Sequence, residues 1–344
     1  MRDGGKRMKS WQIFSIRRSK RCVLVILAVL LLLTVVLSLM VGAVKVTPQK
    51  VVSALLGQND GSTSARIVLY TRLPRTCAAL LAGMALAVSG MVIQTVLNNP
   101  LASPGIIGVN SSAGFAVALV CAIAPQAQKY TPFVAFAGAL AGVLLVMILS
   151  QSMAASRITV VLAGVAISNL FSAGIDAVVT FVPDALNGVT DFRIGGFDGV
   201  TMEQLQAPAG IIFLSLFLLL TLSQQLDILA LGSDTAKSLG LAVQTMQVVF
   251  LVLAAALAGA AVSFSGLLGF IGLIVPHIMR RLVGEESGIL LISSALGGAF
   301  FVAICDLLAR IVAAPFVIPV GIVLAFAGAP FFLWLLFKQR GGRT

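Results

Sequence analysis

The sequence predicts an all-α polytopic membrane protein with about ten transmembrane helices and both termini in the cytoplasm. Hydrophobic residues make up 59% of its 344 residues, charged residues make up only 10%, and the mean hydropathy is +1.08. Apolar segments of membrane length recur along the chain, and its first segment is strongly basic. A soluble domain has roughly a quarter of charged residues, so this composition excludes that class.

The first predicted helix follows a basic N-terminal segment, residues 1–21, which holds 8 of the 23 lysines and arginines. The apolar run from Cys22 to Val44 is 23 residues long. We interpret it as a spanning helix, because it can cross a hydrocarbon core of ~30 Å and is longer than the usual apolar region of a signal peptide. Basic residues directly before such a run are typical of a cytoplasmic anchor on the anionic lipid bilayer, so no nucleic acid partner is predicted.

Nine further apolar segments are long enough to be spanning helices. They lie at about 75–97, 105–124, 132–150, 158–182, 208–226, 241–262, 267–283, 289–309 and 315–337. The polar segments between them are too short to fold alone, and the chain has no Gly/Ser linker or obvious tandem repeat. We therefore predict one transmembrane domain, residues 22–337, followed by a cytoplasmic tail, residues 338–344.

The distribution of basic residues orients the predicted helices. Ten spans place both termini on one side, and with that side taken as cytoplasmic the inside carries 15 lysines and arginines and the outside carries 8. This excess follows the positive-inside rule. Segments 45–65 and 183–207 then face outward, and segment 227–240 faces the cytoplasm.

Residues suited to catalysis or metal binding are scarce. Cys22, Cys77, Cys121 and Cys305 occur singly and without CxxC spacing, which indicates neither a zinc site nor a disulfide framework. His277 is the only histidine, it has no carboxylate close to it in sequence, and a lone Pro-His at a helix terminus is more often structural. We predict no catalytic residue, no metal site and no cofactor.

The sequence also lacks a nucleotide-binding P-loop, whose pattern is GxxxxGK[ST]. The nearest Lys-Ser pair, at 237–238, follows Ala236, and Leu231 stands where the first glycine belongs. The chain is therefore not predicted to bind ATP by this route.

Polar residues recur every fourth position in the fifth predicted helix, at Ser168, Ser172, Asp176 and Thr180, with Asn169 adjacent. At 3.6 residues per turn, this spacing keeps them on one face. Two interpretations are open: interhelical hydrogen bonding on a packed face, or a face that lines a hydrated pathway.

The inner segment LDILALGSDTAKSLGLAV, residues 226–243, predicts a short capped helix exposed to the cytoplasm. Gly232 suits a turn, Ser233 or Asp234 suits the N-cap, and Gly240 suits the C′ position. A capped helix of this kind can be gripped by a soluble partner. The alternative is an ordinary interfacial loop.

Five segments carry a family resemblance: RLPRTCAALLAGMALAVSGMVIQTVLNNPLASPGIIGV (72–109), LDILALGSDTAKSLG (226–240), GLLGFIGLIVPHIMRRLVG (266–284), DLLAR (306–310) and IPVGIVLAFAGAPFFLWLL (318–336). Together they resemble the membrane permease subunits of type II ATP-binding-cassette (ABC) importers, which take up iron–siderophore chelates, haem and vitamin B12. The match runs in order over about 270 residues.

The resemblance implies a homo- or heterodimer of permease subunits with two cytoplasmic ATPase subunits and an extracytoplasmic substrate-binding protein, in the bacterial cytoplasmic (inner) membrane. It implies that the short helix between helices 6 and 7 is a coupling helix that sits in a groove on the ATPase. The coupling residues are then Ser233, Asp234, Ala236, Leu239 and Gly240. Helices five and ten line the pathway in the family, which favours the hydrated interpretation of the polar face on the fifth helix.

Three arginines at outer helix ends depart from the positive-inside pattern. The resemblance implies that Arg72, Arg75 and Arg310 face outward and pair with acidic residues of the binding protein. In the alternative, Arg310 pairs with Asp306 four residues earlier, and the other two arginines extend to lipid headgroups. Both can hold between docking events.

The chain departs from the family pattern at four places. Val317 replaces a usual glutamate, and residues 110–112 (Asn-Ser-Ser) replace a glycine-rich segment. FRIGG at 192–196 replaces a tryptophan-led motif, and residues 286–288 replace an Asp-His-Arg motif. Such changes suit one half of a heterodimer.

The sequence therefore predicts the permease subunit of an ABC importer, with an iron–siderophore chelate as the expected cargo. Haem or vitamin B12 is the alternative within the family. An ion-coupled secondary transporter is the alternative from another class, but it would normally carry several intramembrane carboxylates, and only Asp176 is a candidate. A membrane-embedded enzyme is disfavoured by the lack of clustered His, Asp or Glu.

Overall fold

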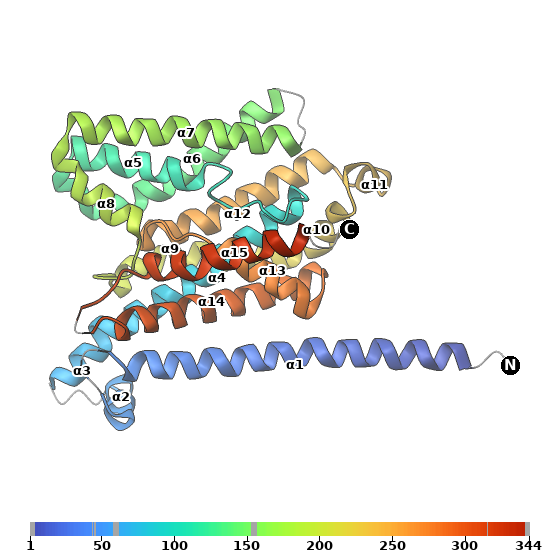
Figure 1. Ribbon diagram of the computed structural model, residues 1–344, viewed down its shortest axis with the longest axis horizontal. Helices are drawn as coiled ribbons and strands as arrows, with labels where there is room; N and C mark the ends of the chain where they lie inside the picture. The colour runs from blue at the N-terminus through green and yellow to red at the C-terminus, as the bar shows by residue number, and fades with distance from the viewer. Residues whose placement is uncertain are drawn as a thin grey trace.

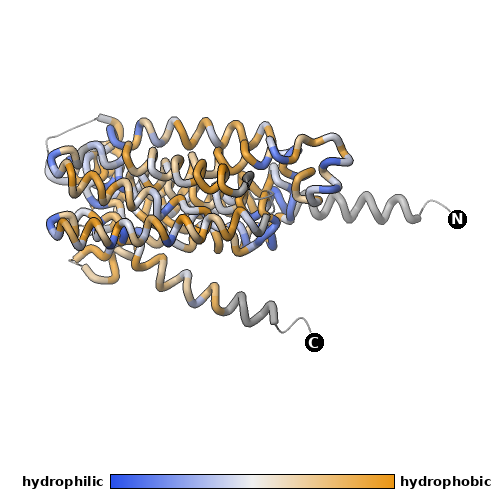
Figure 2. The backbone as a smooth tube through the Cα atoms, turned by 90° about the horizontal axis from the view of Figure 1, so that it is seen from above, coloured by the Kyte–Doolittle hydropathy of each residue, from blue (hydrophilic) through white to orange (hydrophobic). Residues whose placement is uncertain are grey.

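Apolar helices packed side by side make up the described structure. The computed structural model describes residues 4–340 except 43, 45, 58–61, 153–156 and 315, and within these ranges it contains no strand. Most of the long helices run along one common direction (Figure 1). Hydrophobic residues fill their middle parts, and hydrophilic residues gather toward the two ends of the bundle (Figure 2). This pattern is the one a bilayer imposes on a multi-pass protein.

Within the described part of the chain, seven helices are long and apolar enough to cross a membrane. They are α1 (Gly4–Met40), the continuous run of α3 (Thr63–Ile67), the π-helical η1 (Val68–Arg72) and α4 (Leu73–Val96), then α6 (Thr131–Ser152), α7 (Arg157–Phe181), α9 (Met202–Thr221), α12 (Val243–Ser265) and α14 (Ser287–Ile311).

The remaining predicted spans coincide with α5 (Val109–Ile123), α13 (Ile271–Val283) and α15 (Val320–Arg340). Both α5 and α13 begin four residues later than predicted, because residues with positive φ precede them. Gly108 has φ +87°, and Gly266 and Phe270 have φ +64° and +66°. A helix cannot pass through such a residue. All ten predicted segments thus overlap a helix, while the count of ten membrane crossings stays a prediction.

The helix α9 begins at Met202, six residues before the predicted start at Pro208. Thr201 accepts from the backbone N–H of Gln204, and the Gln204 side chain accepts from the backbone N–H of Thr201. This reciprocal capping box defines the first turn. Pro208 lies inside the helix.

Short helices mark the two ends of the bundle. One end, which we call the outer end, carries α2 (Pro48–Leu55), α3 and α8 (Leu186–Ile194), with the 3₁₀ turns η2 (Pro125–Tyr130) and η3 (Pro183–Ala185) beside α5 and α8. The other, which we call the inner end, carries α10 (Ser223–Ala230) and α11 (Ser233–Ser238). The N-terminal end of α1 and the C-terminal end of α15 also lie at the inner end (Figure 1). This agrees with the predicted even number of spans.

Parts of two predicted segments lie outside the described residues. They are residues 1–3 of the basic N-terminal segment and residues 341–344 of the tail, and Lys45 is also outside. The side chains of residues 4–19 are likewise not described.

The helix α4 forms the centre of the bundle and is almost wholly buried against α12, α13 and α14. Glycines allow the closest approaches. A methyl group at Gly83 would overlap the backbone carbonyl of Gly298 in α14, and one at Gly90 would overlap the backbone of Gly272 in α13. Small residues at such crossings let helix backbones pack without intervening side chains.

A second group of helices, α5, α6 and α7, packs beside this centre mainly through contacts of α6 with α12. Gly138 and Gly142 of α6 lie against Ser112 of α5 in the same close manner. The helix α7 is the least covered of the long helices. One of its faces is therefore open in the single chain.

The crossing of α4 and α14 predicts a steric effect of a single methyl group. Gly83→Ala should lower the free energy of unfolding by about 1–3 kcal/mol, because the two backbones must separate. Gly210→Ala is the matched control, since Gly210 is also helical but has no atom within 4 Å of an added Cβ. Thermal unfolding midpoints of the detergent-solubilised chain measure the difference. Equal midpoints for the two variants would show that the crossing is not tight.

Candidate functional site

The three predicted docking arginines lie together at the outer end, where α1, α4 and α14 meet. Arg72 closes η1, Arg75 lies in the first turn of α4, and Arg310 lies in the last turn of α14. The residues are buried, with 5%, 6% and 7% of their surface exposed. Polar groups of the same chain surround them.

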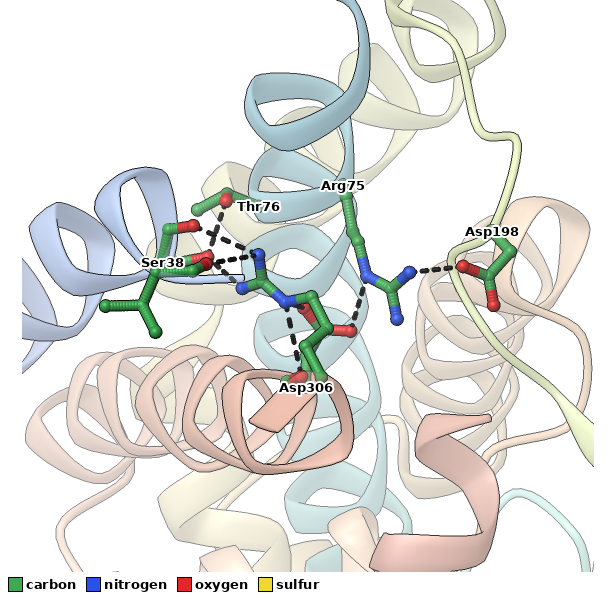
Figure 3. A network of polar contacts seen from close by, with 7 residues as sticks. Ser38, Arg75, Thr76, Asp198 and Asp306 are labelled. Atoms are coloured by element: carbon green, nitrogen blue, oxygen red, sulfur yellow. Dashed lines mark hydrogen bonds and ion pairs between the residues drawn. The ribbon is translucent and has the colours of Figure 1, made fainter. Parts of the chain in front are cut away.

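A buried carboxylate stands at the centre of this cluster. Asp306 of α14 is 1% exposed, its Oδ1 accepts from Nε of Arg75 at 2.8 Å, and its Oδ2 lies 3.1 Å from Nε of Arg310 (Figure 3). Both carboxylate oxygens are therefore engaged by guanidinium groups. One negative charge holds the ends of two helices together.

The C-terminal part of α1 completes the cluster. Arg310 donates to the backbone oxygen of Ser38 at 3.0 Å and to its hydroxyl at 2.5 Å, and this hydroxyl also bonds Thr76 at 2.7 Å. Arg72 donates to the backbone oxygen of Leu39 at 2.8 Å and to that of Val44. Carbonyl groups at the end of a helix lack intrahelical partners, so these arginines satisfy the end of α1.

A second carboxylate reaches the cluster from the loop between α8 and α9. Asp198 accepts from Nη1 of Arg75, and 60% of its side chain is exposed (Figure 3). Backbone hydrogen bonds just before Asp198 hold this loop in place. The N–H of Gly196 donates to the carbonyl of Ser265 at 2.8 Å, and the N–H of Leu267 donates to the carbonyl of Phe192 at 2.9 Å. Asp198 also lines a cavity of about 480 Å³ at the outer end.

The structure changes the interpretation of the arginines. They were predicted to face outward, but all three are buried and bonded within the chain. The alternative pairing of Arg310 with Asp306 is confirmed, whereas the predicted extension of Arg72 and Arg75 to lipid headgroups is wrong. Sequence spacing could not reveal Asp198 or Ser38 as partners, because they are separated from the arginines by long stretches of chain. The docking role stays a prediction.

The inner end presents the predicted coupling segment as the short helix α11. Gly240 has φ +81°, its N–H donates to Lys237 at 2.9 Å, and the N–H of Leu241 donates to Ala236 at 3.0 Å. These two bonds form a Schellman motif, so the predicted C′ glycine is confirmed. The predicted cap at Ser233 or Asp234 is wrong: the N-cap is Gly232, with no side-chain bond.

One of the predicted coupling residues is buried against the bundle, and the other four are half-buried or exposed. Ala236 is fully buried and fastens α11 to the bundle, while Ser233 is half-buried and Asp234 and Gly240 are exposed. Leu239 is 59% exposed, and Leu231, just before the helix, is 62% exposed. Two large apolar side chains at the rim of a polar end are suited to contact with another protein.

Two polar contacts that the sequence did not indicate hold the inner end. Arg280 of α13 donates to the hydroxyl of Thr95 at 3.0 Å and to the side-chain oxygen of Gln94, whose amide donates to the carbonyl of Gly272 at 2.8 Å. This group joins α13 to the end of α4. In the sequence, Arg280 is only one of the 15 positive charges on the predicted inner side.

The second contact caps α14 from another helix. Asp227 of α10 accepts from the backbone N–H of Ser287 at 2.8 Å, and Glu286 beside it pairs with Lys20 at 3.0 Å. An acidic side chain at a helix N-terminus satisfies an otherwise unpaired donor and complements the helix dipole. The segment leading into α11 is thereby tied to α14.

The predicted polar face of α7 is largely uncovered in the single chain. Ser168 is half-buried and donates to the carbonyl of Gly105 at 3.4 Å, whereas Asn169, Ser172, Asp176 and Thr180 are exposed. Packing against other helices of the same chain therefore accounts for Ser168 alone. Near the outer end, Asp176 lies 3.8 Å from Arg193, and both side chains are mostly exposed.

No metal site is found within the described residues, where no three His, Cys, Asp or Glu side chains are close enough to hold an ion. His277 packs edge-on against Phe331 with ring centres 6.5 Å apart. This contact fits the structural role that the sequence predicted for His277.

The apolar helical bundle with polar ends has the features of a multi-pass membrane protein, and comparisons with known proteins specify its family. The chain belongs to the FecCD transport family, which matches residues 30–338. The resemblance found in the motifs is thereby confirmed.

The relatives are import permeases. The Fe(3+)-citrate import system permease protein YfmE of Bacillus subtilis (strain 168) is 37% identical over 94% of this chain and 98% of its own length. The vitamin B12 import system permease protein BtuC of Citrobacter koseri is 36% identical over 97% of this chain and its whole length. A solved structure, an inward-facing conformation of a metal-chelate type ABC transporter, matches with a TM-score of 0.81 and 30% identity over 92% of this chain and 99% of its own. These relatives are permeases of ABC importers rather than ATPases.

The outer cluster predicts a stability effect for its central carboxylate. Asp306→Asn should lower the free energy of unfolding by about 3–5 kcal/mol, because it leaves the buried guanidinium of Arg310 without a counter-charge and that of Arg75 with Asp198 alone. Asp184→Asn, at an exposed position in η3, removes the same charge without touching the cluster and should change little. Thermal midpoints in detergent compare them. A drop for Asp306→Asn no larger than that of the control would show that the arginines do not need this carboxylate.

Proposed function

We propose that this chain is the permease subunit of an ABC importer that carries a chelated iron compound across the bacterial inner membrane. It forms a homo- or heterodimer of permeases, binds two cytoplasmic ATPase subunits, and receives its cargo from an extracytoplasmic binding protein. Ten spans place both termini and α11 in the cytoplasm. The coverage of nearly the whole chain by import permeases supports this function.

The observation that carries the proposal is the form of α11. This short helix is followed by a fixed glycine and flanked by two exposed leucines, and it lies at the same end as the start of α1 and the end of α15. The chain lacks a P-loop sequence of its own, so the energy of ATP hydrolysis must enter through contact with another subunit. We assign this contact to Ser233, Asp234, Leu239 and Gly240, with Ala236 as the anchor.

The outer end takes the binding protein. Arg72, Arg75 and Arg310 carry three positive charges against the two negative charges of Asp306 and Asp198, which leaves one positive charge in excess. This excess favours an acidic partner and steers its approach. Because the arginines are buried, they act with the cluster rather than as free side chains.

The exposed polar face of α7 supports a transport pathway between two permease subunits. Asn169, Ser172, Asp176 and Thr180 would be costly against lipid, whereas an aqueous path or a second subunit satisfies them. Ser168 marks the edge of this face. The face therefore belongs at the centre of the dimer.

An iron–siderophore chelate is the proposed cargo, with haem and vitamin B12 as the alternatives. Relatives carry names that specify Fe(3+)-citrate, iron(3+)-hydroxamate, hemin and vitamin B12. Membership of the family disfavours an ion-coupled secondary transporter. Uptake by the reconstituted transporter of an iron–hydroxamate chelate, haem or cobalamin, each with a matching binding protein, distinguishes the three.

The proposed topology predicts the sidedness of single cysteines in a chain whose native cysteines are replaced. Leu56→Cys, at an exposed outer position, should react with an impermeant maleimide in intact spheroplasts. Asp234→Cys should react only after the membrane is permeabilised. Labelling of Asp234→Cys in intact spheroplasts would show that the orientation is the reverse of the one proposed.

Coupling predicts a specific effect of a side chain at Gly240. Gly240→Val should abolish ATP-driven uptake while the chain still inserts and assembles, because left-handed backbone costs a β-branched residue roughly 1–2 kcal/mol and the end of α11 unwinds. Gly57→Val is the matched control, since Gly57 has φ +74°, has equally open surroundings and lies at the outer end. Uptake and ATP hydrolysis in proteoliposomes are measured together. Normal uptake by Gly240→Val would show that α11 does not form the coupling contact.

A further inference from the structure

Arg75 forms ion pairs with two carboxylates, one buried and one exposed. Asp306 is 1% exposed and uses both oxygens on guanidinium groups, whereas Asp198 is 60% exposed and engages Arg75 with Oδ1 alone. Asp306 is enclosed by three helices, and Asp198 lies on a loop at the wall of the outer cavity. Only Asp198 can leave Arg75 without disrupting the bundle.

The guanidinium of Arg75 has an unused donor. Within the described part of the chain, its Nη2 is buried and has no hydrogen-bond partner. Asp198 meets only Nη1, so the pair is not the two-pronged contact that arginine makes with a carboxylate in its preferred geometry. A carboxylate that bound Nη1 and Nη2 together would satisfy this side chain better than Asp198 does.

We propose that Asp198 is an internal competitor for the acidic side chain of the binding protein, which displaces it from Arg75 on docking. This inference rests on the proposed function. Before docking, Asp198 compensates the charge of Arg75 and fixes its position. During docking, the partner's carboxylate takes Nη1 and Nη2, and Asp198 turns into the solvent of the outer cavity.

The competition has a thermodynamic consequence. Where Asp198 is paired with Arg75, that pair must break before the binding protein docks. The observed affinity of the transporter for the binding protein is therefore the intrinsic affinity multiplied by the fraction of transporters in which Asp198 has left Arg75. Asp306 stays bonded to Arg75 throughout the exchange, so no buried guanidinium is left without a counter-charge, which would otherwise be costly. Binding is therefore reversible without disturbance of the helix ends beneath it.

The first experiment tests the pair without any binding protein. Arg75→Gln, Asp198→Asn and the double variant form a cycle of thermal midpoints for the assembled transporter. The loss of stability caused by Asp198→Asn should vanish in the Arg75→Gln background, since the partner is already gone. An equal loss in both backgrounds would overturn the pair and with it the competition.

The second experiment measures association of the binding protein with the assembled transporter in nanodiscs. Asp198→Asn should raise the affinity by roughly five- to tenfold relative to Asp191→Asn. Asp191 lines the same cavity, is exposed and makes no ion pair within the described part of the chain, so its variant reproduces the loss of charge alone.

Three outcomes distinguish the competition proposal from the docking proposal. An equal rise in the two variants would show that Asp198 acts only through its charge, and a fall in Asp198→Asn would make it a direct contact of the partner. Either result overturns the competition while docking stands. If the unmodified transporter fails to bind a binding protein whose cargo it takes up, the docking proposal itself fails, and the competition with it.

Discussion

The arrangement of the outer end depends on one buried carboxylate. Asp306 compensates the guanidinium groups of Arg75 and Arg310, and through them α4 and α14 are held to the last turn of α1. Burying such a group alone would be prohibitive, and burying the arginines without it would be equally so. The cluster therefore requires all its members, which explains why so much charge lies inside an otherwise apolar bundle.

Close helix contacts make this cluster possible. Gly83 and Gly298 bring α4 and α14 together along their length, so that Arg75 and Asp306 meet at hydrogen-bond distance at the outer end. Side chains at these crossings would separate the helices and pull the charges apart. The apolar crossing and the polar cluster are consequently parts of one constraint.

The sequence predicted the helices well but the partners of its charged residues less completely. Apolar length predicted where the long helices lie, and Gly240 predicted the C-terminal end of α11, because both features depend on neighbouring residues. The N-cap of α11 at Gly232, and the late starts of α5 and α13, depend on backbone geometry that residue type alone does not define. The i, i+4 pair of Asp306 and Arg310 was visible in the sequence, whereas Asp198 and Asp227 join segments far apart in the chain.

The two central helices are fixed by polar groups at both ends. In α14, Asp227 caps the inner end and Asp306 forms ion pairs at the outer end. In α4, Gln94 accepts from Arg280 at the inner end, and Arg75 pairs with Asp306 at the outer end. Sliding α4 along α14 would break buried charge pairs and close-packed backbone contacts at once, and packed cores resist continuous deformation. Relative motion is cheaper where contacts are few, as they are along the open face of α7. The central pair is therefore the frame against which the less covered helices can move.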